Sequence, residues 1–302
     1  MENNDSLIFK VTNDKKPIIF SDVDGTLYND FNILDETKKD ISFAQKNNAD
    51  FNICTGNPIF ERMLNVSSEV NANYLIASSG SQIYDLKQKK IIKTWPMSFD
   101  NLKKILDFIK NEDVQMLFWD NDNYYFINDN YYRNNEIILH HFLNVDSIKK
   151  NAKKYNNEKI MPLKIEIYGQ KDLLKRKEVN ERLLGRLKTL DNISVFSVGS
   201  HLEILFKNVT KASAINWMTN NIYFCSINDI MAIGDGNNDL DMLKLVGFSY
   251  AMANANQEVL NIAKFFTSAV EQNGLGEAII DYLYRLKNIT RKYMLHNFNE
   301  KD

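Results

Sequence analysis

The stretch Ile18-Ile19-Phe20-Ser21-Asp22-Val23-Asp24-Gly25-Thr26-Leu27 decides the fold of this chain. A short apolar run that ends in polar residues is typical of a fully buried strand. The two acids then follow the carboxyl end of that strand, where open α/β sheets place their ligand crevices. Side chains of an extended segment alternate, so Asp22 and Asp24 project to the same side. Two close carboxylates repel unless one is protonated or a cation lies between them, and this cost points to chemistry.

Helix and strand patterns alternate on both sides of a central segment, which predicts βαβ units with right-handed crossovers. We therefore expect an α/β fold whose core is a Rossmann-like, doubly wound parallel sheet. The predicted strands of this core are residues 17–21, 49–54, 74–77, 230–233, 248–252 and 264–267, with helices between them.

The middle of the chain, from about Leu86 to Gly199, has a different pattern. Asn121-Asp122-Asn123 lies between two strand patterns and predicts a hairpin, so this sheet is expected to be antiparallel. The simplest interpretation is an α+β cap of residues 86–199 inserted into a core of residues 1–85 and 200–302. The predicted elements of the cap are strands at 114–119, 124–127, 163–168 and 193–198 and helices at 99–111 and 171–190.

Composition excludes several classes of function. The 302 residues are 44% hydrophobic and 25% charged with a net charge of -2. The chain therefore lacks the excess of positive charge that is typical of proteins that bind nucleic acid or acidic membranes. Lysine-rich runs at Lys87–Lys93 and Lys149–Lys154 are interpreted as solvated faces. No run approaches the roughly 20 apolar residues of a membrane span, and no signal peptide is apparent. Two distant cysteines fit a reducing compartment, so we expect a cytoplasmic protein with no obligate protein partner evident.

Three further segments place polar groups where core strands end or helices begin. Thr55 and Gly56 precede a helix, whose free amides favour a phosphate. Lys211 lies near a predicted helix start, from which it can reach a phosphoryl oxygen. Gly234-Asp235-Gly236-Asn237-Asn238-Asp239 ends a strand in one acid and adds a second acid four residues on. Each segment alone is explained by an ordinary turn or a surface lysine, but their joint occurrence in this order favours a shared site.

The four segments resemble the four motifs of the haloacid dehalogenase superfamily, which here cover the whole chain. A cap inserted after the third core strand resembles the type IIB, Cof-like branch of metabolite phosphatases. That resemblance implies a phosphomonoesterase acting on a small phosphorylated metabolite, most simply a sugar phosphate.

The resemblance also implies a role for each site residue. Asp22 would be the nucleophile that forms an aspartyl-phosphate, and Asp24 would be the general acid and base. Mg²⁺ would be held by Asp22, the backbone carbonyl of Asp24 and Asp235, and Asp239 would orient a ligand or a metal-bound water. The phosphoryl oxygens would be bound by Val23, Thr55, Gly56, Lys211 and Asn238.

The chain departs from the pattern of this branch at two positions, which bear on the substrate rather than on catalysis. Asn57 follows the Thr-Gly motif where an arginine is usual, and Ser79 stands where asparagine is common. In the cap, the aromatic residues near Trp119 and Tyr124–Phe126, with Tyr131 and Tyr132, fit hydrophobic packing better than sugar stacking. His140 and His141 are interpreted as structural or surface residues, and His201 is at best a substrate contact.

Two other functions stay open. The first is a phosphomutase or another phosphotransferase of the same superfamily, which must shelter its aspartyl-phosphate from water. The second is a non-catalytic binding module, whose mark would be the loss of Asp22 or Asp235, and both are present.

Overall fold

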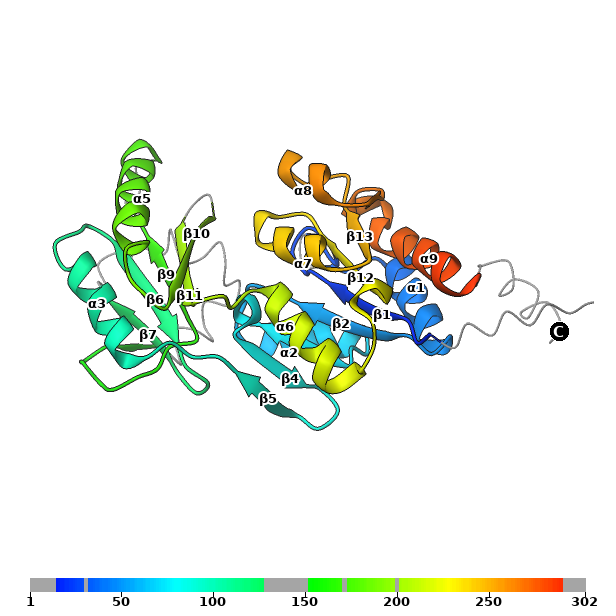
Figure 1. Cartoon of the computed structure of the whole chain (residues 1–302), viewed down its shortest axis with the longest axis horizontal. Coiled ribbons are helices and arrows are strands. Elements are labelled where there is room, and N and C mark those ends of the chain that lie inside the picture. The colour runs from blue at the N-terminus through cyan, green and yellow to red at the C-terminus, as the bar shows by residue number, and fades with distance from the viewer. Residues whose placement is uncertain (1–14, 30–31, 128–151, 170–172, 199–200, 290–302) are drawn as a thin grey trace, which may run out of the picture.

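The computed structural model describes residues 15–29, 32–127, 152–169, 173–198 and 201–289. Their strands form two sheets, one of eight strands and one of six. Figure 1 shows the two sheets in adjacent lobes, each with its own helices. The lobe with the eight-stranded sheet is called the core below, and the lobe with the six-stranded sheet is called the cap.

The core sheet has the order β14-β13-β12-β1-β2-β3-β4-β5. Neighbours from β14 to β3 pair in parallel, and β4 and β5 add an antiparallel edge. Since β1 lies between β2 and β12, the chain order reverses at β1, and a ligand crevice is expected at its carboxyl end. The strands are β1 (Ile18–Ser21), β2 (Asp50–Cys54), β3 (Tyr74–Ala77), β4 (Gln82–Asp85), β5 (Lys90–Thr94), β12 (Ile230–Gly234), β13 (Phe248–Ala251) and β14 (Phe265–Phe266).

Helices cover both faces of the core sheet, because its strands are apolar on both sides. The residues of β1 show this: Ile19 packs into one hydrophobic cluster, whereas Ile18 and Phe20 pack into the other. The predicted doubly wound α/β core is therefore confirmed. The first cluster is covered by α1 (Asp35–Lys46), α2 (Glu61–Glu69) and α9 (Gly274–Lys287), and the second by α6 (Lys211–Met218), α7 (Leu240–Leu245) and α8 (Gln257–Ile262).

The cap sheet has the order β10-β11-β9-β6-β7-β8. The predicted hairpin joins β6 and β7, and the pairing is antiparallel except that β8 pairs in parallel with β7. The expectation of a wholly antiparallel sheet was wrong at that edge. The elements are β6 (Gln115–Trp119), β7 (Tyr124–Ile127), β8 (Ala152–Lys154), β9 (Lys164–Tyr168), β10 (Ile193–Val198), β11 (His201–Phe206), α3 (Phe99–Ile109) and α5 (Leu173–Leu187).

The two faces of the cap sheet differ in chemistry, because side chains alternate along each strand. Ile165 and Ile167 of β9, with Leu202 and Ile204 of β11, join the hydrophobic cluster beneath α3 and α5. On the opposite face the same two strands place Lys164 and Glu166 of β9, and His201 and Glu203 of β11. The charged residues discussed below come from this polar face.

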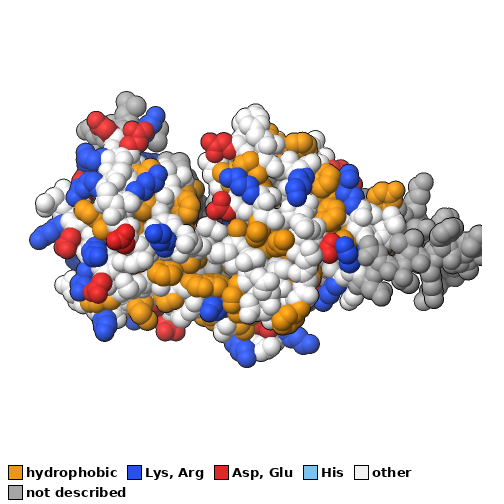
Figure 2. Space-filling view, viewed as in Figure 1, with side chains coloured by type: hydrophobic (Ala, Val, Ile, Leu, Met, Phe, Trp, Pro, Cys, Tyr) orange, Lys and Arg blue, Asp and Glu red, His pale blue; other side chains and the backbone are white. Residues whose placement is uncertain are grey.

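The predicted domain limits at residues 86 and 199 stay a prediction. The chain leaves the core sheet after Thr94 of β5 and enters the cap sheet at Gln115 of β6. It leaves the cap sheet after Phe206 of β11 and returns to the core sheet at Ile230 of β12. Tyr131, Tyr132, His140 and His141 lie outside the described residues. Within the described part of the chain, no helix has the length and apolar character needed to cross a membrane. Basic and acidic side chains are interspersed over both lobes on the face shown in Figure 2.

Candidate active site

Three of the predicted motifs meet at the carboxyl edge of the core sheet. Asp22 follows β1, Thr55 follows β2 and Asp235 follows β12, and these strands are neighbours. The amide of Asp22 donates to the carbonyl of Ile233 at 3.0 Å, which fixes the start of the loop after β1. The sheet order thus brings together segments that are more than 200 residues apart in the sequence.

Lys211 joins this group as the first residue of α6. The side chain of Thr210 caps the helix by accepting from the amide of Ser213 at 3.2 Å, which fixes where the helix begins. The Lys211 Nζ lies 2.6 Å from Asp22 Oδ1 and 2.7 Å from Asp239 Oδ1. Burial opposes the charge, but the two aspartates outweigh it and raise the pKa of Lys211 well above its ordinary value.

Asp239 is fully buried and held in place by the backbone. Its Oδ2 accepts from the amides of Asp235 and Gly236 at 3.1 and 3.0 Å. A Cβ on Gly234 would lie 2.4 Å from the Asp239 carboxyl carbon, so the site needs glycine there. The Gly-Asp-Gly motif therefore makes room for the acid that holds Lys211.

Asp22, Asp235 and Asp239 offer carboxylate oxygens within 4.8 Å of one another. Burial, followed by the charge of Asp239, raises the pKa of Asp22 and raises that of Asp235 to about 6. A nearby cation would reverse these shifts, and carboxylate oxygens are the donors that Mg²⁺ prefers. The donor set therefore fits a hard divalent cation.

The carboxylate of Asp24 points toward helix α2 rather than toward the other acids. It accepts from Asn57 Nδ2 at 3.0 Å and from Arg62 Nη2 at 2.8 Å. The Arg62 guanidinium also lies over the Tyr28 ring, 5.3 Å from its centroid. Sequence reasoning missed Arg62, although its position in the first turn of the helix after the Thr-Gly motif was a usable signal. Asn57, which was noted as a departure, is part of this arrangement.

A cavity of about 340 Å³ lies between the core and the cap and is lined by Asp22, Asp24 and Asp235. The predicted phosphate-binding residues Gly56 and Asn238 also line it. Thr55 and Lys211 are buried beside it, and the Val23 side chain is buried in the core cluster. A second cavity of about 380 Å³ includes Asn238 and Lys211 in its lining, but neither Asp22 nor Asp24 is among its described lining residues.

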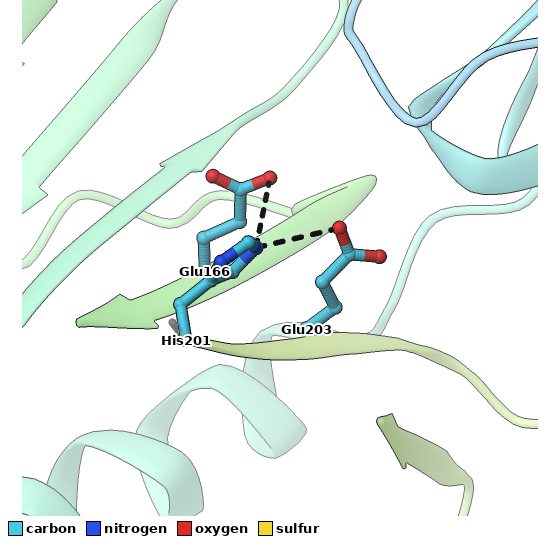
Figure 3. A group of neighbouring side chains, drawn as sticks. All are labelled: Glu166, His201 and Glu203. Atoms are coloured by element: carbon cyan, nitrogen blue, oxygen red, sulfur yellow. Dashed lines mark ion pairs between the residues drawn. The ribbon is translucent and has the colours of Figure 1, made fainter. Parts of the chain in front are cut away.

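Besides Val198 of β10, four polar cap residues line the roof of the 340 Å³ cavity: Lys164 and Glu166 from β9, and His201 and Glu203 from β11. All four are buried, and we call them the charged cap cluster. The Lys164 Nζ lies 2.9 Å from Glu166 and 2.6 Å from Glu203. Figure 3 shows the His201 ring between the two glutamates, with its Nε2 3.4 Å from Glu203 and 4.0 Å from Glu166.

Charge pairing within the cluster outweighs burial. Burial disfavours both ions, yet Glu166 and Glu203 raise the pKa of Lys164, and Lys164 and His201 lower that of Glu203. Glu166, His201 and Glu203 could together offer ligands to a metal ion. The Lys164 ammonium already lies against both carboxylates, so we do not assign a metal to this cluster.

The cap contacts the core through several hydrogen bonds beside the cavity. The Lys164 Nζ donates to the Gly56 carbonyl at 3.0 Å, and the Trp119 indole donates to Ser78 Oγ at 2.8 Å. Ser79 Oγ donates to Glu203 at 3.1 Å. Ser78 and Ser79 both have φ of 54°, a left-handed conformation that is uncommon for serine. Trp119 is thus buried in packing contacts, as expected, and is also one of the links between cap and core.

Residues 19–279 match the sequence profile of the haloacid dehalogenase-like hydrolases. The chain therefore belongs to this family, and the predictions of the family and of an enzyme are confirmed.

Among its relatives is the putative phosphatase YxeH of Bacillus subtilis, which is 27% identical over 284 residues, or 87% of this chain and 96% of the relative. The 5-amino-6-(5-phospho-D-ribitylamino)uracil phosphatase YcsE of the same organism is 25% identical over 264 residues, or 87% and 94% of the two chains. A solved structure, the subclass IIB sugar phosphatase BT4131, superposes with a TM-score of 0.73 over 88% of this chain and 99% of its own at 18% identity. This likeness confirms the fold of a core with an inserted cap.

Proposed function

We propose that this protein is a Mg²⁺-dependent phosphomonoesterase that hydrolyses small phosphorylated metabolites, most simply sugar phosphates, through an aspartyl-phosphate on Asp22. The proposal rests mainly on one observation at the carboxyl end of β1. The Lys211 Nζ lies within 2.7 Å of a carboxylate oxygen of Asp22 and of one of Asp239. The names of the two relatives, which are a putative phosphatase and a phosphatase, support the same reaction class.

In the first step, an oxygen of the Asp22 carboxylate attacks the phosphorus of the ester. The bond between phosphorus and the ester oxygen breaks, and the leaving alkoxide takes a proton from Asp24. Arg62 and Asn57, which contact the Asp24 carboxylate, orient it toward the leaving group. The phosphoryl group is then covalently attached to Asp22.

In the second step, Asp24 takes a proton from a water molecule that attacks the phosphorus. The bond to Asp22 breaks, which releases inorganic phosphate and restores both carboxyl groups. Through both steps the charge on the phosphoryl oxygens is stabilised by nearby donors. We assign this role to Lys211, Asn238, Thr55 and the amides of Val23 and Gly56.

Asp22, Asp235 and the backbone carbonyl of Asp24 would hold Mg²⁺, with Asp239 orienting one of the metal's ligands. When bound, Mg²⁺ neutralises charge on the phosphoryl group and on the crowded carboxylates. Asp239 is already committed to Lys211 and two backbone amides, which suits an orienting role better than direct ligation.

The proposal is tested by phosphate release from p-nitrophenyl phosphate and from a panel of phosphorylated metabolites, with and without Mg²⁺. We expect turnover only with the cation and none for Asp22→Asn. The matched control is Asp281→Asn, which removes a carboxylate of a surface ion pair on α9. No turnover of any substrate by the wild-type protein would contradict the proposal, and formation of hexose 6-phosphate from hexose 1-phosphate would identify a mutase instead.

We also propose a cytoplasmic location and no macromolecular partner for this activity. Cys54 and Cys225 are free thiols in the structure, which suits a reducing compartment.

A further inference from the structure

We propose that the charged cap cluster of Lys164, Glu166, His201 and Glu203 is the leaving-group site and makes the enzyme prefer uncharged, hydroxyl-rich leaving groups over leaving groups that carry a carboxylate. This inference rests on the proposed phosphatase function and names the substrate class of the same site. It concerns the part of the substrate that remains after phosphate is removed.

The cluster lies next to the place where phosphate would bind. A Cβ on Gly56, in the loop after β2, would lie 3.6 Å from the Lys164 Nζ and 3.8 Å from Asn238 Nδ2. The cluster also shares its cavity with Asp22 and Asp24. A group esterified to a phosphate on the core therefore extends directly toward the cluster.

The charge of the cluster favours hydroxyl donors. Two glutamates face one lysine, so the carboxylates of the cluster outnumber its ammonium group. Glu203 accepts from Lys164 and from Ser79, and a carboxylate has about four lone-pair sites in all. The remaining lone pairs of Glu203 can accept hydrogen bonds from the O–H groups of a polyol, whereas a carboxylate on the leaving group would be repelled by both glutamates.

Stability alone does not explain a cluster of this kind. Buried ion pairs are often no more stabilising than apolar side chains of the same size, because each ion loses its hydration. The opposite face of the same two strands carries Ile165, Ile167, Leu202 and Ile204 in an ordinary hydrophobic core. Charged side chains are thus confined to the face that lines the cavity, where a ligand can use them.

The test compares substrates that differ only by a terminal CH₂OH or carboxylate group. Suitable pairs are glycerol 3-phosphate with 3-phosphoglycerate, and a hexitol 6-phosphate with the corresponding 6-phosphohexonate. For the wild-type protein we expect kcat/KM to be at least about tenfold higher for the polyol of each pair, because like charges in a buried site repel strongly.

Isosteric variants then connect this preference to the cluster. Glu203→Gln and Glu166→Gln each remove one negative charge, so the ratio of polyol to acid should fall at least about threefold. The matched control is Glu181→Gln, an exposed carboxylate on α5 of the same lobe, which should leave the ratio unchanged. Circular dichroism of each variant shows whether it folds, and if neither glutamine variant folds, the wild-type ratio decides.

The outcomes separate this inference from the proposed function. A wild-type protein that hydrolyses p-nitrophenyl phosphate but neither polyol, or that treats both members of each pair equally, overturns the inference alone. A preference that survives both glutamine substitutions in folded protein also overturns it. A wild-type protein that hydrolyses no phosphomonoester contradicts the proposed function itself.

Discussion

At the scale of single residues, the site concentrates negative charge that Lys211 and a bound cation can balance. Asp22, Asp235 and Asp239 lie close together, and two of the three have raised pKa values. Such a cluster costs stability in the absence of a cation, because each raised pKa reports a carboxylate that ionises less readily in the folded protein than in the unfolded chain.

The first prediction concerns pH. The pKa of Asp235 is about 6 in the folded protein against an ordinary 3.8, so this residue stabilises the fold below pH 4, and that contribution is lost as the pH rises through 6. We expect the melting temperature of metal-free protein to fall between pH 4.5 and 7, by roughly 2 to 4 °C for each kcal/mol lost.

Two controls isolate the contribution of Asp235. Asp235→Asn should flatten this part of the pH profile, and added Mg²⁺ should raise the melting temperature of the wild-type protein at pH 7. A variant with the same slope as the wild type would show that other groups cause it.

The second prediction concerns Arg62, whose Nη2 lies 2.8 Å from Asp24. Arg62→Ala should lower kcat/KM about 10- to 100-fold, because a general acid that is displaced by as little as 1 Å loses about 10²-fold in rate. Arg285→Ala, on the surface of α9, is the matched control. Equal activity of the two variants would show that Arg62 does not contribute to catalysis.

At the scale of elements, the start of α6 is fixed by a close approach of backbone. Gly80 has φ of +105°, and a Cβ there would lie 2.2 Å from the Thr210 carbonyl oxygen. Thr210 caps the helix that begins with Lys211. The turn after β3 therefore positions the lysine that contacts Asp22.

The third prediction follows from this contact. Gly80→Ala should lower the free energy of unfolding by about 2 kcal/mol or more, from backbone strain together with overpacking. The control is Gly185→Ala on α5, where a Cβ would meet no atom within 4 Å. That substitution should stabilise the protein by about 0.5–1 kcal/mol. Equal unfolding free energies in chemical denaturation would contradict the packing described here.

Much of the core was predictable, because its strands are apolar runs that end in polar motifs. Strands rich in charge were missed. β5 and β8 lie in the lysine-rich runs that we interpreted as solvated faces, and both are edge strands, where lysines discourage pairing with other chains. β11 was missed although His201 and Glu203 alternate with apolar residues, a pattern that is typical of a half-buried strand. Only the tertiary structure shows that these polar side chains are buried.

The part of the site that lies in the four sequence motifs was also predictable. The motif residues needed only the rule that strand ends meet at one edge of the sheet. Arg62 could have been placed from its position in the first turn of α2. Lys164, Glu166 and Glu203 could not, because their positions depend on how the cap lies over that edge.

At the scale of the whole molecule, the cap and the core together line the 340 Å³ cavity, and hydrogen bonds link the two lobes beside it. The Trp119 indole donates to Ser78, and Lys164 donates to Gly56, so both links connect the cap sheet to turns that follow core strands. Opening of the cap would break these hydrogen bonds together.

The fourth prediction tests this connection. Trp119→Phe removes the indole donor, so opening at residues 78–82 should become easier by about 1 kcal/mol, which is an approximately fivefold faster amide exchange. Trp217→Phe, a tryptophan of α6 that packs against Trp95, is the matched control and should leave exchange at residues 78–82 unchanged. Unaltered exchange in both variants would show that this link does not hold the cap.

The central claim is that Asp22 is the nucleophile. Mass spectrometry of protein quenched in acid during turnover, followed by peptide mapping, should locate a phosphoryl group on Asp22, and Asp22→Asn should carry none. A wild-type protein that turns over substrate without any phosphoryl group on Asp22, or with the group on another residue, would contradict the account.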